Sequence, residues 1–271
     1  MIEFLQSAFE YSFMRNALFG ILLVTPAFGI LGTMIVNNRM AFFSDALGHS
    51  ALTGIAIGVI FGIKAPIWSM MAFSILLAVA IIAVKNANTA STDTIIGVFS
   101  STAVALGIVI LSYNGGFSKN TVYLIGDFLS INKTDLVMLG ILLVAVIVLW
   151  VVIFNKLLLV SLNQSLAGSR GIKVRFYEYA FTLVMAVIVT FSIQWVGILV
   201  ISSMLVLPAA SARNIAKNVR QYHICSVAIS LISGLLGLLL SYFLGSATGA
   251  TIVLISAFFF AVTFLFKLRS A

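Results

Sequence analysis

Residues 41–62 read AFFSDALGHSALTGIAIGVIFG, a largely apolar stretch that is long enough to cross a lipid bilayer as a helix. It contains two ionisable residues, Asp45 and His49, and residues 51–62 carry no charge. Because the two are four positions apart, their side chains lie on one face of a helix. Ionisable groups inside a membrane helix are costly and usually mark a path for an ion or a substrate. The stretch therefore predicts a membrane-spanning helix with one polar face.

The composition of the whole chain is that of an integral membrane protein. Of its 271 residues, 62% are hydrophobic and 8% are charged, whereas a soluble domain carries about 25% charged residues. The mean hydropathy is +1.21. We therefore expect an all-α, polytopic membrane protein with about eight or nine transmembrane helices, forming a single domain over residues 1–271.

Nine apolar segments are candidate spans. They are residues 16–36, 41–62, 66–84, 94–112, 136–154, 177–193, 197–210, 223–243 and 250–266. The seventh is short and contains Pro208, so a broken or partial span is an alternative there. Pro26 falls inside the first span and is expected to bend that helix.

The basic residues predict the orientation. With the N-terminus outside and all nine segments crossing, eleven of the fifteen Lys and Arg residues fall in inner loops. The inner loop of residues 155–176 is the most basic. If the seventh segment does not cross, the N-terminal half could be inverted. The basic residues are scattered singly, so the net charge of +8 is not that of a nucleic-acid-binding surface, and we expect no nucleic-acid partner.

Asp45 and His49 are the candidate metal ligands, because carboxylate and imidazole groups bind Mn²⁺, Fe²⁺ and Zn²⁺. The alternative is a helix-capping Asp45 with a satisfied, buried His49. Thr53 continues the same stripe. Two ligands do not complete a metal site, but a symmetric dimer would double the pair. The neighbouring stripe consists of small residues, which let helices approach closely. These are Ala46, Ser50, Gly54, Gly58 and Gly62.

Two other carboxylates have plainer interpretations. Asp127 falls in an outer loop, where it could line an entry vestibule but fits a solvated residue better. Asp93 precedes the fourth span and fits helix capping or a contact at the inner surface. The chain contains no Gly-x-x-x-x-Gly-Lys-Ser/Thr motif and no catalytic triad, so we expect neither ATP binding by the chain itself nor enzymatic activity.

Four stretches together carry a family resemblance. They are residues 44–54 (SDALGHSALTG), 92–97 (TDTIIG), 204–213 (MLVLPAASAR) and 246–254 (SATGATIVL). In this order they resemble the motifs of the permeases of the metal-ion (zinc, manganese, iron chelate) ABC importer family. The resemblance implies a single permease domain in the cell membrane that imports a divalent transition metal (manganese, zinc or iron), with no permanently bound cofactor.

The resemblance also implies partners. These are a second copy of the chain, two cytosolic ATP-binding subunits, and an extracellular or periplasmic metal-binding protein. It implies that Asp45 and His49 touch the metal. The contact with the ATP-binding subunits would lie near Leu162, Ala167, Gly171 and Arg175. Where this chain has LNQSLA at residues 162–167, the family often has acidic residues.

Two other functions remain open at this point. An ABC permease for a siderophore or a corrinoid would need a wider path and no ligand pair. A proton-coupled secondary transporter would use Asp45 and His49 as a proton relay and would work without an ATPase. The sequence does not choose among manganese, zinc and iron, since Asp and His suit all three metals.

Overall fold

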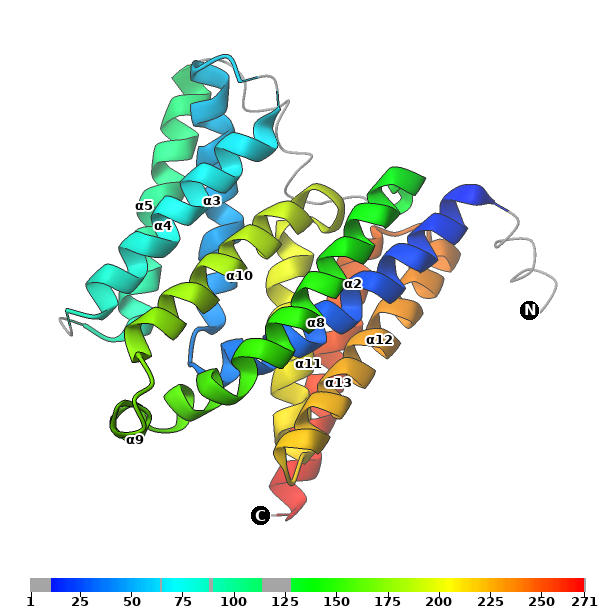
Figure 1. The fold of residues 1–271 in the computed structure, drawn as a ribbon. Helices are drawn as coiled ribbons and strands as arrows, with labels where there is room; N and C mark the ends of the chain where they lie inside the picture. Colours follow the sequence, from blue (N-terminus) through cyan, green and yellow to red (C-terminus); the bar gives the residue numbers. More distant parts are fainter. Residues whose placement is uncertain (1–10, 64, 88–89, 114–127, 271) are drawn as a thin grey trace. The chain divides into compact units, whose positions relative to one another are not determined.

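The structure is a computed structural model that describes residues 11–63, 65–87, 90–113 and 128–270. Throughout these residues the regular elements are helices, and eight of them are long and apolar enough to cross a membrane (Figure 1). The prediction of an all-α, multi-pass membrane protein is therefore confirmed.

The helices match the nine expected segments one to one. The eight long helices are α2 (Ser12–Asn37), α3 (Ala41–Ile60), α4 (Pro66–Lys85), α5 (Thr92–Tyr113), α8 (Lys133–Leu162), α10 (Val174–Val196), α12 (Val219–Leu244) and α13 (Thr248–Ser270). The shorter elements are η1 (Phe128–Ser130), α9 (Gln164–Ser169) and α11 (Ile198–Ile215). Helix α11, which contains Pro208, corresponds to the short seventh segment and is not among the eight candidate spans. Helix α8 runs on to Leu162, well past the expected end at residue 154.

The chain divides into two compact units, and each unit is assembled from separate stretches of sequence. One comprises Met1–Val36, Gly126–Trp150 and Trp195–Ala271, and the other comprises Asn37–Ile125 and Val151–Gln194. Because the chain passes repeatedly between the two, neither unit is a contiguous sequence domain. A single permease domain over residues 1–271 remains a prediction.

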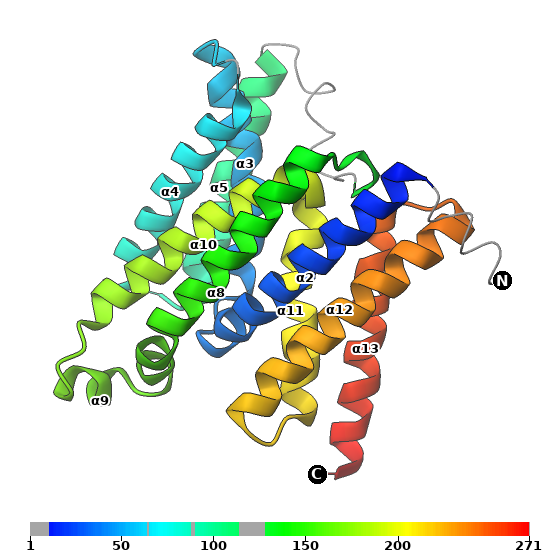
Figure 2. The same cartoon turned by 45° about the vertical axis from the view of Figure 1, so that its right-hand side comes forward.

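In the first unit, α11, α12 and α13 pack against one another (Figure 2). Helix α2 packs closely on α12. A Cβ atom added at Gly234 would lie only 2.7 Å from side-chain atoms of both Ile21 and Thr25. The same helix approaches α11 at Gly32, where a Cβ atom would collide with the carbonyl oxygen of Leu205. Glycine at these points therefore sets the helix spacing, as small residues do in membrane bundles.

In the second unit, α3 packs against both α4 and α5 (Figure 1). The predicted small-residue stripe of α3 faces α4. A Cβ atom at Gly54 would lie 2.5 Å from the Cα atom of Met70, and the hydroxyl oxygens of Ser50 and Ser74 are 3.3 Å apart. The close helix approach predicted for this stripe is thus present between α3 and α4. The side of α3 that faces α4 is therefore not accessible.

Candidate functional site

Asp45 and His49 lie one turn apart on α3 and face each other. Oδ1 of Asp45 is 3.5 Å from Nε2 of His49, and the two side chains are 46% and 38% exposed. Residues 46–48, which lie between them, are all buried. The pair is therefore an accessible polar point on a helix that is otherwise mostly enclosed.

The two atoms lie within ion-pair distance of each other, and this spacing is also compatible with a shared metal ion. Two ligands at about 2.1 Å from a tetrahedral ion lie about 3.4 Å apart, close to the 3.5 Å between Nε2 and Oδ1. The pair is not a complete site. Among the residues that the structure describes, no group of three or more His, Cys, Asp or Glu side chains could hold a metal ion. Further ligands would have to come from beyond these described side chains, such as water or a second molecule.

Asp45 also lines a pocket of about 320 Å³ together with residues of α5. Asp93, Ser100 and Ser101 line the same pocket, so a second carboxylate faces the space next to Asp45. The cap of α5 comes from Ser91, whose Oγ accepts a hydrogen bond from the backbone N–H of Thr94 at 3.2 Å. Asp93 is therefore available to the pocket, and the capping interpretation of this residue is wrong.

Thr53 does not extend the accessible polar face. It is fully buried, and its hydroxyl group donates a hydrogen bond to the carbonyl oxygen of Ala103 on α5. A Cβ atom at Gly107 would lie 2.6 Å from Oγ1 of Thr53. Position 53 is thus used for packing between α3 and α5, and the accessible polar face contains only Asp45 and His49 of this stripe.

The loop that was expected to contact an ATPase contains the short helix α9, which is capped at both ends. The Asn163 side chain accepts a hydrogen bond from the backbone N–H of Leu166 at 3.0 Å. At the other end, the N–H groups of Gly171 and Ile172 bind the carbonyl oxygens of Gly168 and Ala167. Gly171 has a φ of +73°, so these bonds form a Schellman motif. The local sequence therefore specifies α9 strongly, although it has only six residues.

The four residues predicted near that contact differ in accessibility. Leu162 is 74% exposed, and Gly171 and Arg175 are also exposed. Ala167 is fully buried, so a contact with a partner in this region would be made by its exposed neighbours.

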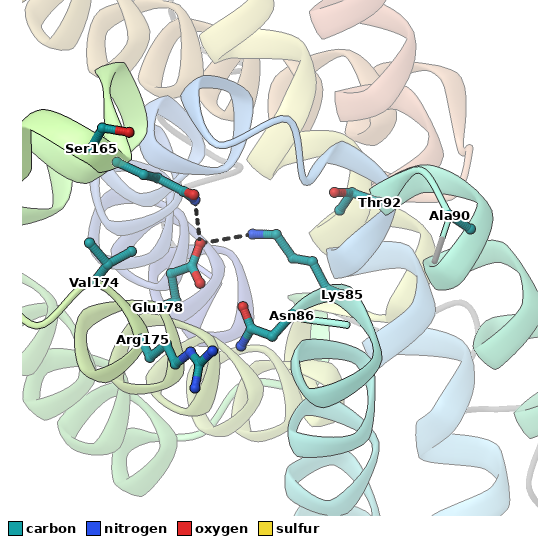
Figure 3. A pocket seen from close by; sticks show the side chains of 9 residues that line it. Lys85, Asn86, Ala90, Thr92, Ser165, Val174, Arg175 and Glu178 are labelled. Atoms are coloured by element: carbon teal, nitrogen blue, oxygen red, sulfur yellow. Dashed lines mark hydrogen bonds and ion pairs between the residues drawn. The ribbon is translucent and has the colours of Figure 1, made fainter. Parts of the chain in front are cut away.

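Behind α9 lies a buried ion pair that the sequence analysis did not identify. Oε1 of Glu178 on α10 is 3.1 Å from Nζ of Lys85 on α4, and it accepts a second hydrogen bond from Nε2 of Gln164 at 3.1 Å (Figure 3). Glu178 is 8% exposed. The signal that could have revealed it was Glu178 itself, an acidic residue inside an expected span.

Asp127, the outer-loop candidate, lies outside the described residues.

Comparisons with known proteins identify the family of the chain. Residues 10–267 match the model of the ABC 3 transport family. The chain is 32% identical to the manganese import system permease protein ScaB of Streptococcus gordonii, over 97% of this chain and 94% of that protein. It is also 32% identical to the high-affinity zinc uptake system membrane protein ZnuB of Haemophilus influenzae, over 88% and 90%.

Two solved structures resemble the fold. PsaBC from Streptococcus pneumoniae in complex with Fab matches with a TM-score of 0.83 and 30% identity, covering 97% of this chain and 95% of that chain. An inward-facing conformation of a putative metal-chelate type ABC transporter matches with a TM-score of 0.67 over 94% of this chain and 85% of that one. At 15% identity, the second match supports the fold alone.

Proposed function

We propose that this chain, which belongs to the ABC 3 transport family, carries manganese or zinc across the membrane past Asp45 and His49. The chain is a multi-pass permease subunit of the cell membrane in an ATP-driven importer, as the sequence resemblance predicted. A permease subunit is not itself an enzyme, so ATP hydrolysis belongs to a separate subunit. This family membership also excludes the alternative of a proton-coupled secondary transporter.

The observation that carries the proposed site is the facing pair on α3. Its nitrogen and oxygen atoms form an ion pair whose spacing is compatible with one shared ion, and both side chains are accessible on a mostly enclosed helix. One carboxylate and one imidazole per chain, with no thiolate, bind a divalent ion less tightly than a complete ligand set would, which favours the release that transport requires. Asp93 adds a second negative charge to the pocket next to Asp45.

A bare metal ion fits this site better than a chelate does. A siderophore or corrinoid presents its own ligands to the metal and would need no protein carboxylate and imidazole. The relatives described above are named for manganese import and zinc uptake. Ferrous iron also suits an Asp and His pair, so it belongs in the same uptake experiment.

We further propose that two copies of the chain act together, so that two Asp45 and two His49 side chains surround the ion. The ligands missing from one chain would then come from its partner. Two cytosolic ATP-binding subunits would meet the surface formed by α9 and the exposed residues Leu162, Gly171 and Arg175. A metal-binding protein on the outer side would deliver the ion.

Uptake of radiolabelled metal tests the site directly. The chain is expressed with its ATP-binding subunit and binding protein in cells that lack other manganese and zinc importers. We expect Asp45→Asn and His49→Gln each to abolish uptake, because each replaces a carboxylate or an imidazole by a neutral amide of similar size that binds these metals far more weakly. Competition by unlabelled Mn²⁺, Zn²⁺ and Fe²⁺ identifies the preferred ion.

Ser44→Ala is the matched control. It removes a hydroxyl group from the position next to Asp45, but Ser44 is fully buried and donates to the carbonyl oxygen of Ala41. It should leave uptake close to that of the unmodified protein. Normal uptake by both ligand variants, at equal membrane expression, would refute the assignment of Asp45 and His49.

A further inference from the structure

A second pocket, of about 410 Å³, lies beside α9 on the predicted inner side of the membrane (Figure 3). We call it the α9 pocket. It is lined by Lys85, Asn86 and Thr92 at the facing ends of α4 and α5, and by Gln164, Arg175 and Glu178 from the α9 and α10 region. Its lining is thus polar and charged, which is unusual for a chain with 8% charged residues.

Among the described residues, the charges in the α9 pocket leave one cation without a counter-ion. The carboxylate of Glu178 is buried and is balanced by Lys85 at 3.1 Å, with Gln164 as a second donor. Arg175 is exposed, and it makes no ion pair with any residue that the structure describes. The pocket therefore presents a guanidinium group that no described carboxylate balances.

The sequence around Arg175 is also positively charged. Residues 155–177 contain four basic residues and no acidic residue. The first carboxylate after this stretch belongs to Glu178, which faces Lys85 in the interior. A partner that docks on this surface must be acidic to be complementary, since like charges across an interface are unfavourable.

We propose that the α9 pocket receives an acidic side chain of the ATP-binding subunit, whose carboxylate pairs with Arg175. The planar guanidinium group can bind both carboxylate oxygens at once. The side chains of Asn86 and Gln164 supply further amide groups in the same pocket. This inference rests on the proposed function, because it requires that an ATP-binding subunit docks at α9.

The position of the pocket also links docking to the metal path. Thr92 lines the α9 pocket, and the next residue, Asp93, lines the pocket that contains Asp45. An acidic side chain bound beside Thr92 would therefore contact the first turn of α5. Movement of the ATP-binding subunit would be transmitted to the Asp45 pocket through this turn.

Binding of the purified ATP-binding subunit to the purified chain tests the proposal. The measurement is made in neutral detergent without added lipid, at low and high salt. We expect Arg175→Glu to weaken binding about tenfold, and the binding of the unmodified chain to weaken more steeply with salt than that of the variant. Arg175→Lys should bind with intermediate affinity, because lysine keeps the charge but loses the two-pronged geometry.

Arg220→Glu is the matched control. Arg220 is an exposed arginine in the first turn of α12, outside the α9 pocket and on the predicted inner side. The substitution makes the same change of charge, and an acidic residue near a helix N-terminus is favourable, so folding should be preserved. Binding of the ATP-binding subunit should match that of the unmodified chain.

The outcomes separate this inference from the proposed function. Equal binding by Arg175→Glu and the unmodified chain would overturn the inference alone. Failure of the unmodified chain to bind the ATP-binding subunit would instead count against the proposed function. If Arg175→Glu binds the subunit normally but loses affinity for phosphatidylglycerol vesicles, the pocket holds a lipid headgroup and our proposal is wrong. Recovery of Arg175→Glu binding by an acid-to-Arg change in the ATP-binding subunit would confirm it.

Discussion

The hydroxyl group of Ser226 donates a 2.7 Å hydrogen bond to the backbone carbonyl oxygen of Gly29 and so joins α12 to α2. One turn along, Ser230 donates in the same way to the carbonyl oxygen of Thr25 at 2.8 Å. Both serines are fully buried. Such bonds require the two backbones to approach closely, and this depends on the absence of a side chain at Gly29. A Cβ atom there would lie 2.9 Å from the Cα atom of Val227.

The first prediction follows from this contact. Gly29→Val should lower thermal stability in detergent far more than Ser226→Ala does. The valine forces the two helices apart and breaks both hydrogen bonds, whereas loss of one interhelical hydrogen bond costs about 0.6 kcal/mol. Unfolding is followed by the temperature at which the monodisperse peak is lost in size-exclusion chromatography.

Gly140→Ala is the control for the first prediction. A Cβ atom at Gly140 on α8 would have no neighbour within 4 Å, so an added methyl group meets open space. Alanine in a helix is also more favourable than glycine by about 1 kcal/mol. The variant should be at least as stable as the unmodified chain. An equal loss of stability in Gly140→Ala and Gly29→Val would show that the close contact of α2 with α12 is not the cause.

A second prediction concerns the buried pair of Lys85 and Glu178. Removal of one partner leaves an uncompensated buried charge, which costs about 3–5 kcal/mol. We therefore expect Glu178→Gln and Lys85→Met each to destabilise the protein strongly. The double variant should be more stable than either single variant, because no charge is then left unpaired and glutamine can still accept a hydrogen bond from Gln164. A double-mutant cycle of unfolding temperatures measures this coupling, and additive effects would contradict it.

The spans and the Asp45 and His49 pair could be predicted from the sequence because both depend on local patterns. A long apolar run by itself predicts a membrane-spanning helix, and residues four apart on one helix must share a face. The end of α8 was missed because Asn155 and Lys156 interrupt the apolar run, although the helix continues to Leu162. The Glu178 pair was missed because its partner Lys85 lies 93 positions away. Likewise, whether Thr53 faces a path or a neighbouring helix is decided by α5 and not by α3.

A third prediction concerns the cap of α9. Gly171→Ala places a side chain at a φ of +73°, which costs roughly 1–2 kcal/mol and weakens the Schellman motif. We expect weaker association with the ATP-binding subunit at unchanged membrane expression. Gly245→Ala makes the same change at a φ of +59° in the C-cap of α12, outside α9, with no neighbour within 4 Å of an added Cβ atom, and it should leave association intact. Identical behaviour of the two variants would mean that the order of α9 does not limit docking.

A fourth prediction distinguishes the two carboxylates that share the Asp45 pocket. Asp93 is exposed at the start of α5, and it lines the pocket beside Asp45 without a hydrogen bond or ion pair to any described residue. Its charge should raise the local concentration of cations without binding the ion directly. Asp93→Asn should therefore raise the KM for metal uptake roughly two- to fivefold and leave the maximal rate nearly unchanged.

Asp135→Asn provides the comparison for Asp93→Asn. It removes the same charge from the first turn of α8, and asparagine can still accept the hydrogen bond that Asp135 receives from the backbone N–H of Asn132. Asp135 does not line the Asp45 pocket, so KM should stay unchanged. If Asp93→Asn abolishes uptake as fully as Asp45→Asn, Asp93 binds the metal ion directly and does not merely attract cations through its charge. If both charge variants raise KM equally, the effect comes from the overall charge of the chain, and the role of Asp93 in the pocket is refuted.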